Sequence, residues 1–519
     1  MRRLVAITVV LALALTGLTA ASGVARAAQY TNPVLPGQQP DPTVARDGST
    51  YYLSVTSRAW APIFPMYRST DLVNWKPIGG ALQHPPAWAA PPFWAPELVD
   101  LGGQKLLYYA ARLRGIRGLP CIGVATATST GGPYRDSGEP LVCPPDGAID
   151  PFVSTDENGT PFLIYRRFGG DGGIWAQQLT PDGRSVVGDE VLLLATQIDD
   201  EGVVEGPAVT RRDGVYYLFF AARDCCKPPC DYVEEVARST SLFGPYTRDP
   251  QLALGSTPAL RCPGHGTLVD DLLGGSWFLH HAVLRDDPAN ARRSTVLDPV
   301  TWQADGWPSI GSAGLPVVTG EGPPGFTAQQ QAPLAPNLHA ARLDLLWQWP
   351  WGLRPRVTQR DGAIVLRGSS RGAVLARQVA PVDVTMQVRV TPHACAAGLA
   401  GFEGAEDAGE AIGAEVTSAG RVRVWRGTTG AGAGRTIALS SRVRGPAAAA
   451  RAAARAPRTL RMTIRDGQKV RFALKSGSRW VNVGSWVTTP ANRGLIQLGM
   501  TCRGTGSSSA RFDSLKIAR

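Results

Sequence analysis

Helical periodicity is nearly absent from this chain of 519 residues, which argues against helical bundles. After the N-terminus no segment stays apolar over the roughly 20 residues that a membrane-spanning helix needs. The sequence is instead rich in turn residues, with 59 Gly and 42 Pro around short β-prone runs, and 44% of its residues are hydrophobic. It predicts an all-β protein of two or three domains.

Consecutive basic residues are also missing from the last third of the chain, although this part is strongly basic. Residues 341–519 contain 28 Lys and Arg against 10 Asp and Glu, within a chain of net charge +11. Such a module has the charge to bind nucleic acid or an acidic polysaccharide. Because the arginines are scattered, we favour an Arg-rich surface without a specific partner, and we expect no nucleic-acid partner.

The N-terminus has the pattern of a secretion signal over residues 1–27. Two arginines are followed by a mostly apolar stretch over 4–18 and by a small-x-small cleavage site at 25–27. An uncleaved membrane anchor is the less favoured alternative, because the apolar stretch is shorter than a bilayer span. We expect a secreted, extracellular protein that begins near Ala28 and, after cleavage, has no membrane contact.

One short pattern occurs five times in the first three-fifths of the chain. Each copy joins a turn to an aromatic, β-prone run, which is typical of a hairpin. The starts are 55, 56, 55 and 61 residues apart, and the copies occupy 47–53, 102–109, 158–165, 213–220 and 274–281. This period predicts a five-bladed β-propeller over residues 29–318.

A short element precedes each turn and begins with an acidic residue in three of the five copies. These elements begin at Asp41, Trp94, Asp150, Glu205 and His265. If the copies superpose, the innermost strands bring the three acids and the histidine to one central axis. Burying these groups is costly for a structural role alone, so the pattern points to chemistry.

Three inward carboxyl groups suit the cleavage of a glycosidic bond without a metal or cofactor. One protonates the leaving oxygen and, in the inverting mode, a second activates water from roughly 6.5–9.5 Å away. A third raises the pKa of the acid by like-charge repulsion. Taken singly, Asp41, Asp150 and Glu205 are equally well explained as turn residues next to Pro or Gly, and it is their recurrence that favours catalysis.

The chain resembles family 43 of the glycoside hydrolases in segments that span the whole propeller. These segments are 32–42, 94–97, 149–153, 204–207, 264–266 and 298–308, in the family's order. The resemblance implies a five-bladed propeller that cleaves arabinose- or xylose-containing glycosides with inversion. It implies that Asp41 is the general base, Glu205 the general acid, and Asp150 the residue that orients the acid and modulates its pKa.

The same resemblance implies further contacts around the acids. Arg293 matches an arginine that contacts sugar and acid, with a register uncertainty of one toward Arg292. His265 matches an axial histidine that in some members ligates calcium or water, so a structural calcium ion is one expectation and a water-bonded histidine the other. Alternation along the strand lets only one of His280 and His281 face the pocket.

Aromatic residues near these elements are candidates for sugar contact. Trp94 is predicted to be a stacking platform in the pocket, with packing between blades as the alternative. Trp60, Trp88 and Phe93 lie in expected loops and are predicted to shape the subsites. Glu97 follows Trp94 on the same element and is expected to point into the blade.

The cysteine count of eight is even, which suits disulfides in an exported protein. We expect Cys395 to pair with Cys502, and Cys121 with Cys143. Two more bridges are expected among the remaining four, which are Cys225, Cys226, Cys230 and Cys262. A zinc site in the latter cluster is less favoured because no histidine is near.

Residues 319–341 have the Gly/Pro/Gln composition of a linker, and alternation then predicts an antiparallel β-sandwich over 342–519. We prefer a sandwich that packs against the propeller and shapes the pocket rim, with a carbohydrate-binding module as the alternative. The chain is expected to be a monomer.

The predicted function is a secreted inverting glycosidase acting on arabinofuranosyl or xylosyl linkages of plant cell-wall polysaccharides or oligosaccharides. One alternative is a sugar-binding propeller without catalysis. The other is a sialidase, because 69–75 resembles an Asp-box, but Val73 replaces the expected Gly and six blades would be needed.

Overall fold

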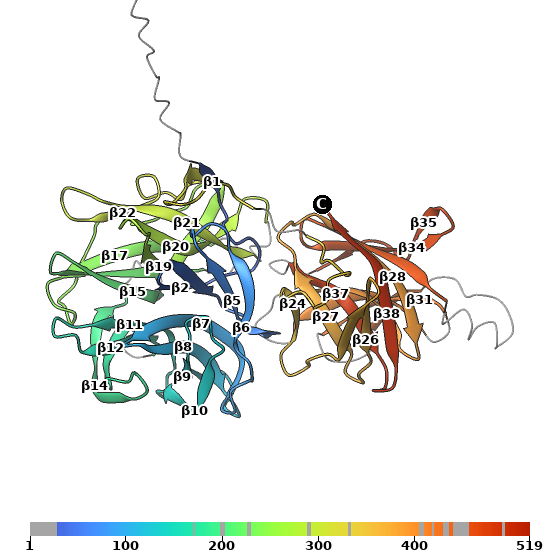
Figure 1. Cartoon of the computed structure of the whole chain (residues 1–519), viewed down its shortest axis with the longest axis horizontal. Helices are drawn as coiled ribbons and strands as arrows, with labels where there is room; N and C mark the ends of the chain where they lie inside the picture. Colours follow the sequence, from blue (N-terminus) through green and yellow to red (C-terminus); the bar gives the residue numbers. More distant parts are fainter. Residues whose placement is uncertain are drawn as a thin grey trace, which may run out of the picture.

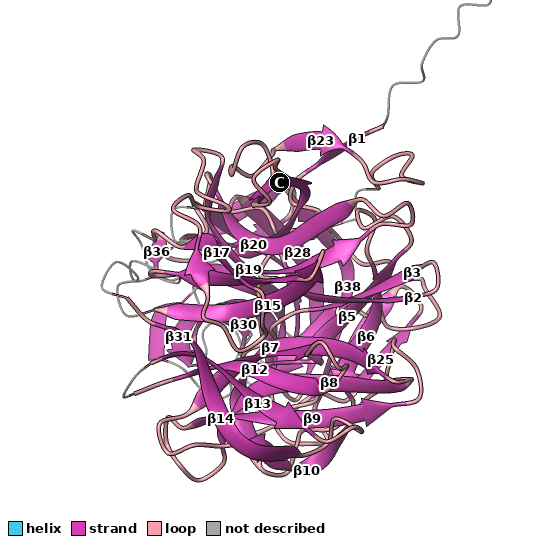
Figure 2. Cartoon of the chain, turned by 90° about the vertical axis from the view of Figure 1, so that its left-hand side faces the viewer, coloured by secondary structure: helices cyan, strands magenta, loops and turns pink. Residues whose placement is uncertain are grey.

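The computed structural model is built from strands joined by turns (Figure 2). It describes residues 28–169, 172–197, 203–225, 230–287, 292–330, 334–403, 409–417, 420–428, 435–439, 456–489 and 494–519. Within these ranges no helix has the length and apolarity to cross a bilayer. The all-β prediction is confirmed. The predicted secretion signal at 1–27 and the residue Cys226 lie outside the described residues.

Five four-stranded sheets form the part of the molecule at the left of Figure 1, one for each copy of the repeat. From the inner strand outward they are β2 (Thr43–Asp47), β3 (Thr50–Ser54), β5 (Ile63–Ser69) and β6 (Lys76–Leu82); β7 (Ala89–Leu101), β8 (Gln104–Leu113), β9 (Pro120–Ala127) and β10 (Arg135–Val142); β11 (Ala148–Thr155), β12 (Pro161–Arg167), β13 (Gly173–Leu179) and β14 (Val186–Ala195); β15 (Val204–Arg212), β16 (Val215–Ala222), β17 (Val233–Ser239) and β18 (Thr247–Arg248); and β19 (Leu260–Asp270), β20 (Ser276–Leu284), β21 (Arg293–Trp302) and β22 (Pro308–Ile310).

The inner strands contact one another in the cyclic order β2, β7, β11, β15, β19 and back to β2, which closes the ring. An apolar cluster fills the space between each pair of neighbouring blades; between the first and the last, for example, Tyr51 and Leu53 pack with Leu279. The five-bladed prediction is confirmed, and the six blades that a sialidase would need are not formed.

The N-terminal segment ties the first blade to the last. Strand β1 (Gln29–Thr31) pairs with β23 (Thr319–Glu321), so the segment predicted as a linker begins with a strand. The Asn32 side chain donates to the carbonyl of Leu297 at 2.8 Å and accepts from the Leu297 N–H at 3.0 Å. These contacts anchor the chain a few residues before Asp41.

Two further antiparallel sheets, each eight-stranded, form the sandwich at the right of Figure 1. The first sheet has the order β32 (Arg435–Leu439), β31 (Val422–Thr428), β30 (Glu410–Val416), β29 (Ala396–Glu403), β37 (Leu495–Arg503), β27 (Ala373–Gln378), β24 (Trp347–Pro350) and β4 (Trp60–Ala61). The second has the order β25 (Val357–Arg360), β26 (Ala363–Arg367), β38 (Ser509–Ala518), β28 (Val384–His393), β33 (Arg458–Arg465), β34 (Lys469–Ser476) and β35 (Arg479–Asn482), with β36 (Val487–Thr488) also on β34. Alternate residues of both sheets fill one apolar core, as the sandwich prediction requires.

Strand β4 comes from the propeller, between β3 and β5 of the first blade, yet it extends the first sandwich sheet by pairing with β24. Trp60 on β4 is 4% exposed and packs edge-on against Phe402 of the sandwich. The prediction that Trp60 shapes a sugar subsite is therefore wrong. Its indole instead fills the interface between the two parts.

Three expected disulfides are present: Cys121–Cys143, Cys230–Cys262 and Cys395–Cys502. The first two pairs tie strands within the propeller to adjacent loops, and the third joins the ends of β29 and β37 in the sandwich. Since Cys230 is bonded to Cys262, neither thiol is available to ligate zinc.

Candidate active site

Each blade of the propeller has a residue with a left-handed backbone at the same position of the repeat, either on the inner strand or, in the first blade, two residues before it. These residues are Asp41, Ala95, Asp150, Gly206 and His265, with φ between 43° and 57°. The pairing register of β7, β11, β15 and β19 shifts next to them, as in a β-bulge. Non-glycine residues pay about 1–3 kcal/mol for this conformation, and such strain collects at functional sites.

The bulges correct one sequence-based expectation. Asp41, Asp150 and His265 occupy the same left-handed position of the repeat, but Glu205 and Trp94 lie one residue before it. In the fourth blade the position itself is taken by Gly206, where a Cβ would come within 2.7 Å of the His265 ring. Glu205 thus reaches the axis from a neighbouring, non-equivalent position.

A cavity of about 430 Å³ opens on the propeller axis and collects most of the predicted site. Its lining includes six residues predicted to act in catalysis or sugar binding, which are Asp41, Trp94, Asp150, Glu205, His265 and Arg293, but none of the three aromatic residues predicted to shape the subsites. The sequence therefore located the cavity correctly, although the role of each residue stays a prediction.

Asp41 is held as a carboxylate by three cationic or imidazole groups. Arg293 Nη1 lies 3.2 Å, His281 Nδ1 3.3 Å and His265 Nδ1 3.7 Å from Oδ1 of Asp41. Burial alone would raise the pKa of Asp41, but these neighbours outweigh it and hold the pKa well below its usual range. An ionised, buried carboxylate is what a general base requires.

Asp150 and Glu205 differ in their partners. Burial raises the pKa of Asp150 to about 7; His265 opposes this, and the charges of Glu205 and Asp41 reinforce it. Glu205 forms an ion pair with Arg166 and accepts a hydrogen bond of 2.8 Å from the hydroxyl of Tyr232. Asp150 therefore retains its proton up to about neutral pH, beside the Glu205 carboxyl.

Two residues that contact the acids were not singled out from the sequence as parts of the site, Arg166 on β12 and Tyr232 just before β17. A third, His281 on β20, was expected only as one of two adjacent histidines of which one faces the pocket. The Tyr232 and His281 rings stack with their centres 5.6 Å apart. Tyr232, which bonds Glu205, is therefore in contact with His281, which faces Asp41. For His281 alternation was a usable signal: it faces Asp41, whereas His280 bonds Asp298 at 2.8 Å on the other side of the strand.

Arg293 and Arg292 point in opposite directions, so the structure decides which of the two faces the cavity. Arg293 contacts Asp41, the predicted base, while Arg292 is buried against the sandwich, and the predicted contact of Arg293 with sugar stays a prediction.

The surroundings of His265 do not fit the calcium ion that the resemblance implied. The imidazole Nδ1 lies 3.7 Å from Asp41 and 3.8 Å from Asp150, and Arg293 already supplies a positive charge to Asp41. Calcium needs six to eight oxygen ligands. Among the described residues no group of three or more His, Cys, Asp or Glu is arranged to hold a metal ion.

Trp94 lies on the wall of the cavity, half-buried, with the Arg112 guanidinium 5.7 Å from its ring centre. Trp88 and Phe93, in contrast, do not form subsites. Trp88 stacks on Tyr109 and is 8% exposed, and Phe93 is fully buried. Both belong to the cluster between the first two blades, so their predicted role is wrong.

Glu97 is a buried carboxyl outside the cavity, as expected. Its Oε2 accepts a hydrogen bond of 2.7 Å from Thr43 on the adjacent inner strand, and burial raises its pKa to about 8. The folded protein therefore keeps a proton there that the unfolded chain loses above pH 4.5. Stability from this group is present at low pH and decreases as pH rises toward 8.

We expect the Glu97→Gln variant to remove this dependence. Gln is neutral at every pH and keeps an acceptor for Thr43, so the variant should gain stability relative to the parent as pH rises from 5 to 8. Urea denaturation at several pH values measures this difference. A stability difference that stays constant over this pH range would show that Glu97 is not protonated in the folded state.

The model of the family described as "Glycosyl hydrolases family 43" matches residues 30–308, more than half of the chain and nearly the whole propeller. The chain belongs to this family. It is 29% identical over 306 residues to a xylosidase/arabinosidase of Butyrivibrio fibrisolvens, covering 54% of this chain and 56% of that protein. It is 26% identical over 293 residues to an extracellular endo-alpha-(1->5)-L-arabinanase of Bacillus subtilis, covering 52% and 86%.

The match spans little more than half of the Butyrivibrio protein and of a xylan 1,3-beta-xylosidase from a Vibrio species, at 56% and 59% of their lengths. Solved structures of family members extend the likeness over both parts of this family 43 chain. The xylan beta-1,4-xylosidase of Bacillus halodurans superposes with a TM-score of 0.74 at 21% identity, covering 94% of this chain and all of that one. At this identity the likeness establishes the fold, sandwich included.

Proposed function

We propose that the chain hydrolyses arabinofuranosyl or xylosyl linkages of plant cell-wall polysaccharides or oligosaccharides, with inversion. The observation that carries the proposal is the set of carboxyls in one cavity: Asp41 is ionised against Arg293, whereas Asp150 keeps a proton up to about neutral pH beside Glu205. The names of relatives, which include xylosidases and arabinanases, support the choice of pentoses.

In the proposed reaction a water molecule between Asp41 and the sugar attacks the anomeric carbon. Asp41 takes one proton from this water as the new carbon–oxygen bond forms. Glu205 gives its proton to the glycosidic oxygen as the old bond breaks, and the resulting carboxylate is stabilised by Arg166 and Tyr232. Asp150, which accepts a 3.1 Å hydrogen bond from the Gly206 N–H, holds the segment that carries Glu205 and exchanges the proton with it.

Purified protein should release pentose from an aryl arabinofuranoside, an aryl xyloside or arabinan. Proton NMR of the first product formed would show the anomeric configuration opposite to that of the substrate if the reaction inverts. Retained configuration would contradict the water-attack mechanism. Binding of arabinan without any sugar release would favour the non-catalytic alternative.

We also propose that the protein is secreted. The apolar stretch at 4–18 and the small residues at 25–27 support this, as do relatives named extracellular in Bacillus subtilis and Cellvibrio japonicus. N-terminal sequencing of protein recovered from the medium of an expressing bacterium should read from near Ala28. A product that keeps the first 27 residues in the cell fraction would contradict export.

A further inference from the structure

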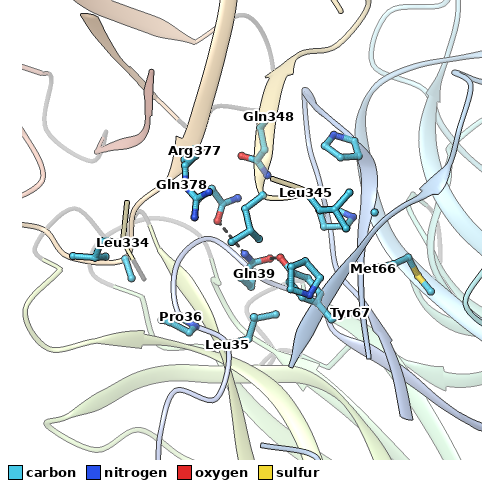
Figure 3. A pocket seen from close by; sticks show the side chains of 16 residues that line it. Leu35, Pro36, Gln39, Met66, Tyr67, Leu334, Leu345, Gln348, Arg377 and Gln378 are labelled. Atoms are coloured by element: carbon cyan, nitrogen blue, oxygen red, sulfur yellow. Dashed lines mark hydrogen bonds between the residues drawn. The ribbon is translucent and has the colours of Figure 1, made fainter. Parts of the chain in front are cut away.

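The sandwich contacts the propeller at the segment that leads to Asp41. Gln378, the last residue of β27, accepts hydrogen bonds on Oε1 from the Gln38 N–H at 3.1 Å and from Gln39 Nε2 at 3.2 Å. Its Nε2 donates to the Gln38 carbonyl at 3.0 Å. Figure 3 shows the Gln378 amide opposite Gln39, beside an apolar pocket lined by both parts of the chain. The Gln378 side chain thus pairs with the main chain of Gln38 as a neighbouring strand would.

The segment held by Gln378 in turn holds Arg293. Gln38 Oε1 accepts a hydrogen bond of 2.7 Å from the Arg293 N–H, and the Gln39 carbonyl accepts one of 2.7 Å from Thr295 Oγ1. Asp41 follows two residues after Gln39, and Arg293 reaches back to it with its guanidinium. One side chain of the sandwich is therefore two hydrogen bonds away from the arginine–aspartate pair.

Val379, the residue after Gln378, contacts Arg292, which directly precedes Arg293 in the chain. The Val379 carbonyl accepts a 3.0 Å hydrogen bond from Arg292 Nε, and the Leu495 carbonyl on β37 accepts one of 2.6 Å from Arg292 Nη2. Arg292 is 2% exposed, so these bonds are shielded from water. The sandwich thus holds Arg292, the residue next to the arginine that contacts Asp41.

We propose that Gln378 is a positioning residue for the hydrolytic site, through which the sandwich sets the placement of Arg293 against Asp41. This inference rests on the proposed function, in which Asp41 is the base. It makes the sandwich a part of the catalytic unit, because Gln378 holds the segment at 38–41 in addition to the contacts that Tyr67 and His281 of the propeller make with it.

Several charged or titratable groups face Asp41 and bear on its ionisation. Arg293 comes from β21, His265 from β19 and His281 from β20, and Asp150 lies across the cavity on β11. Only Arg293 is connected to Gln378 by the hydrogen bonds described above. Loosening Gln378 should therefore move the guanidinium charge of Arg293 away from Asp41 and leave the imidazoles in place.

The test is the Gln378→Met variant of the full chain, which keeps the length of the side chain and removes all three hydrogen bonds. We expect kcat on an aryl pentoside to decrease about tenfold with little change in KM, as for a small misplacement of a catalytic group. The acidic limb of the profile of kcat against pH should move to higher pH. Gln387→Met, at a half-buried glutamine on β28 of the other sheet, is the matched control.

A second variant approaches the same link from the propeller. Gln38→Met leaves the main-chain bonds to Gln378 and removes the acceptor for Arg293, so it should reproduce the shift of the acidic limb even if Gln378→Met does not fold. The double variant should shift the limb no further than either single one.

The outcomes separate this inference from the proposed function. If Asp41→Asn is inactive while Gln378→Met and Gln38→Met both match Gln387→Met in kcat and pH profile, the positioning role is overturned and the function stands. If Asp41→Asn retains full activity, the proposed function itself fails.

Discussion

Replacing Glu205 with Gln should lower kcat on a natural pentoside about 10³-fold, within the range for loss of a general acid. The loss should be much smaller for an aryl glycoside with a good leaving group, because a phenolate of low pKa departs with little help from a proton. Gln preserves the hydrogen bond from Tyr232 to the side-chain oxygen, so the folded structure should survive. Measuring kcat against the pKa of the leaving group for parent and variant gives the result directly.

Glu190 provides a matched control for this substitution. Like Glu205, it pairs with an arginine, Arg167, and accepts a hydrogen bond from a tyrosine, Tyr165 at 2.7 Å, but it does not line the cavity. Glu190→Gln should therefore leave the dependence on leaving group unchanged.

Asp150→Asn separates the role of Asp150 from that of Glu205. If Asp150 only orients Glu205 and modulates its pKa, the variant should lose activity on good and poor leaving groups alike. It should also move the basic limb of the pH profile, which in the parent is expected near pH 7, where Asp150 loses its proton. Dependence on leaving group in Asp150→Asn but not in Glu205→Gln would reverse the two assignments.

Replacing Asp41 with Asn should lower kcat by about 10³-fold or more for every substrate, whatever the leaving group. Asn has the shape of Asp but cannot take a proton from water, and this step is needed for each turnover. In the parent, activity should persist at pH values well below the usual pKa of an aspartate, because Arg293 and the two imidazoles keep Asp41 ionised. Steady-state kinetics from pH 3 to 9 would measure both effects.

The control for Asp41 is Asp298, a buried aspartate that contacts His280 on β20 as Asp41 contacts His281 on the same strand. Asp298 is fully buried and bonds His280 at 2.8 Å, but it lies away from the cavity. Asp298→Asn should lower the melting temperature and keep kcat. If Asp41→Asn also lost stability but kept kcat on folded protein, Asp41 would be a structural partner of Arg293 and not the base.

Much of the fold was predictable because it depends on local patterns. A hairpin needs only a turn and an alternating run, and five such units at a nearly constant spacing can bury their faces only against one another. The cavity residues Asp41, Asp150 and Glu205 were found for the same reason, since they lie at nearly the same place in the first, third and fourth repeats. A bulge then moved Glu205 by one residue from the position of the other two, and no feature of the spacing marks it.

Contacts between distant elements were not predictable in this way. Arg166 and His281 lie on second strands of their blades and Tyr232 just before a third strand, and the twist of each sheet decides which of their side chains reach the axis. Trp60 was assigned to a sugar subsite because a loop tryptophan looks the same in sequence whether it meets solvent, a ligand or another domain. Only the pairing of β4 with β24 shows that it is interface.

Repetition and alternation therefore sufficed to place three acids and a histidine around an axis, because each short segment shows these properties in its own sequence. The state of each acid depends on partners far away in the chain: Arg293 lies 252 residues from Asp41, and Gln378 lies 340 residues from the Gln38 backbone that it holds. Charge and hydrogen bonding act through space over a few ångströms, so which carboxyl is ionised, and what holds it there, follows from the packing of blades and sandwich against each other.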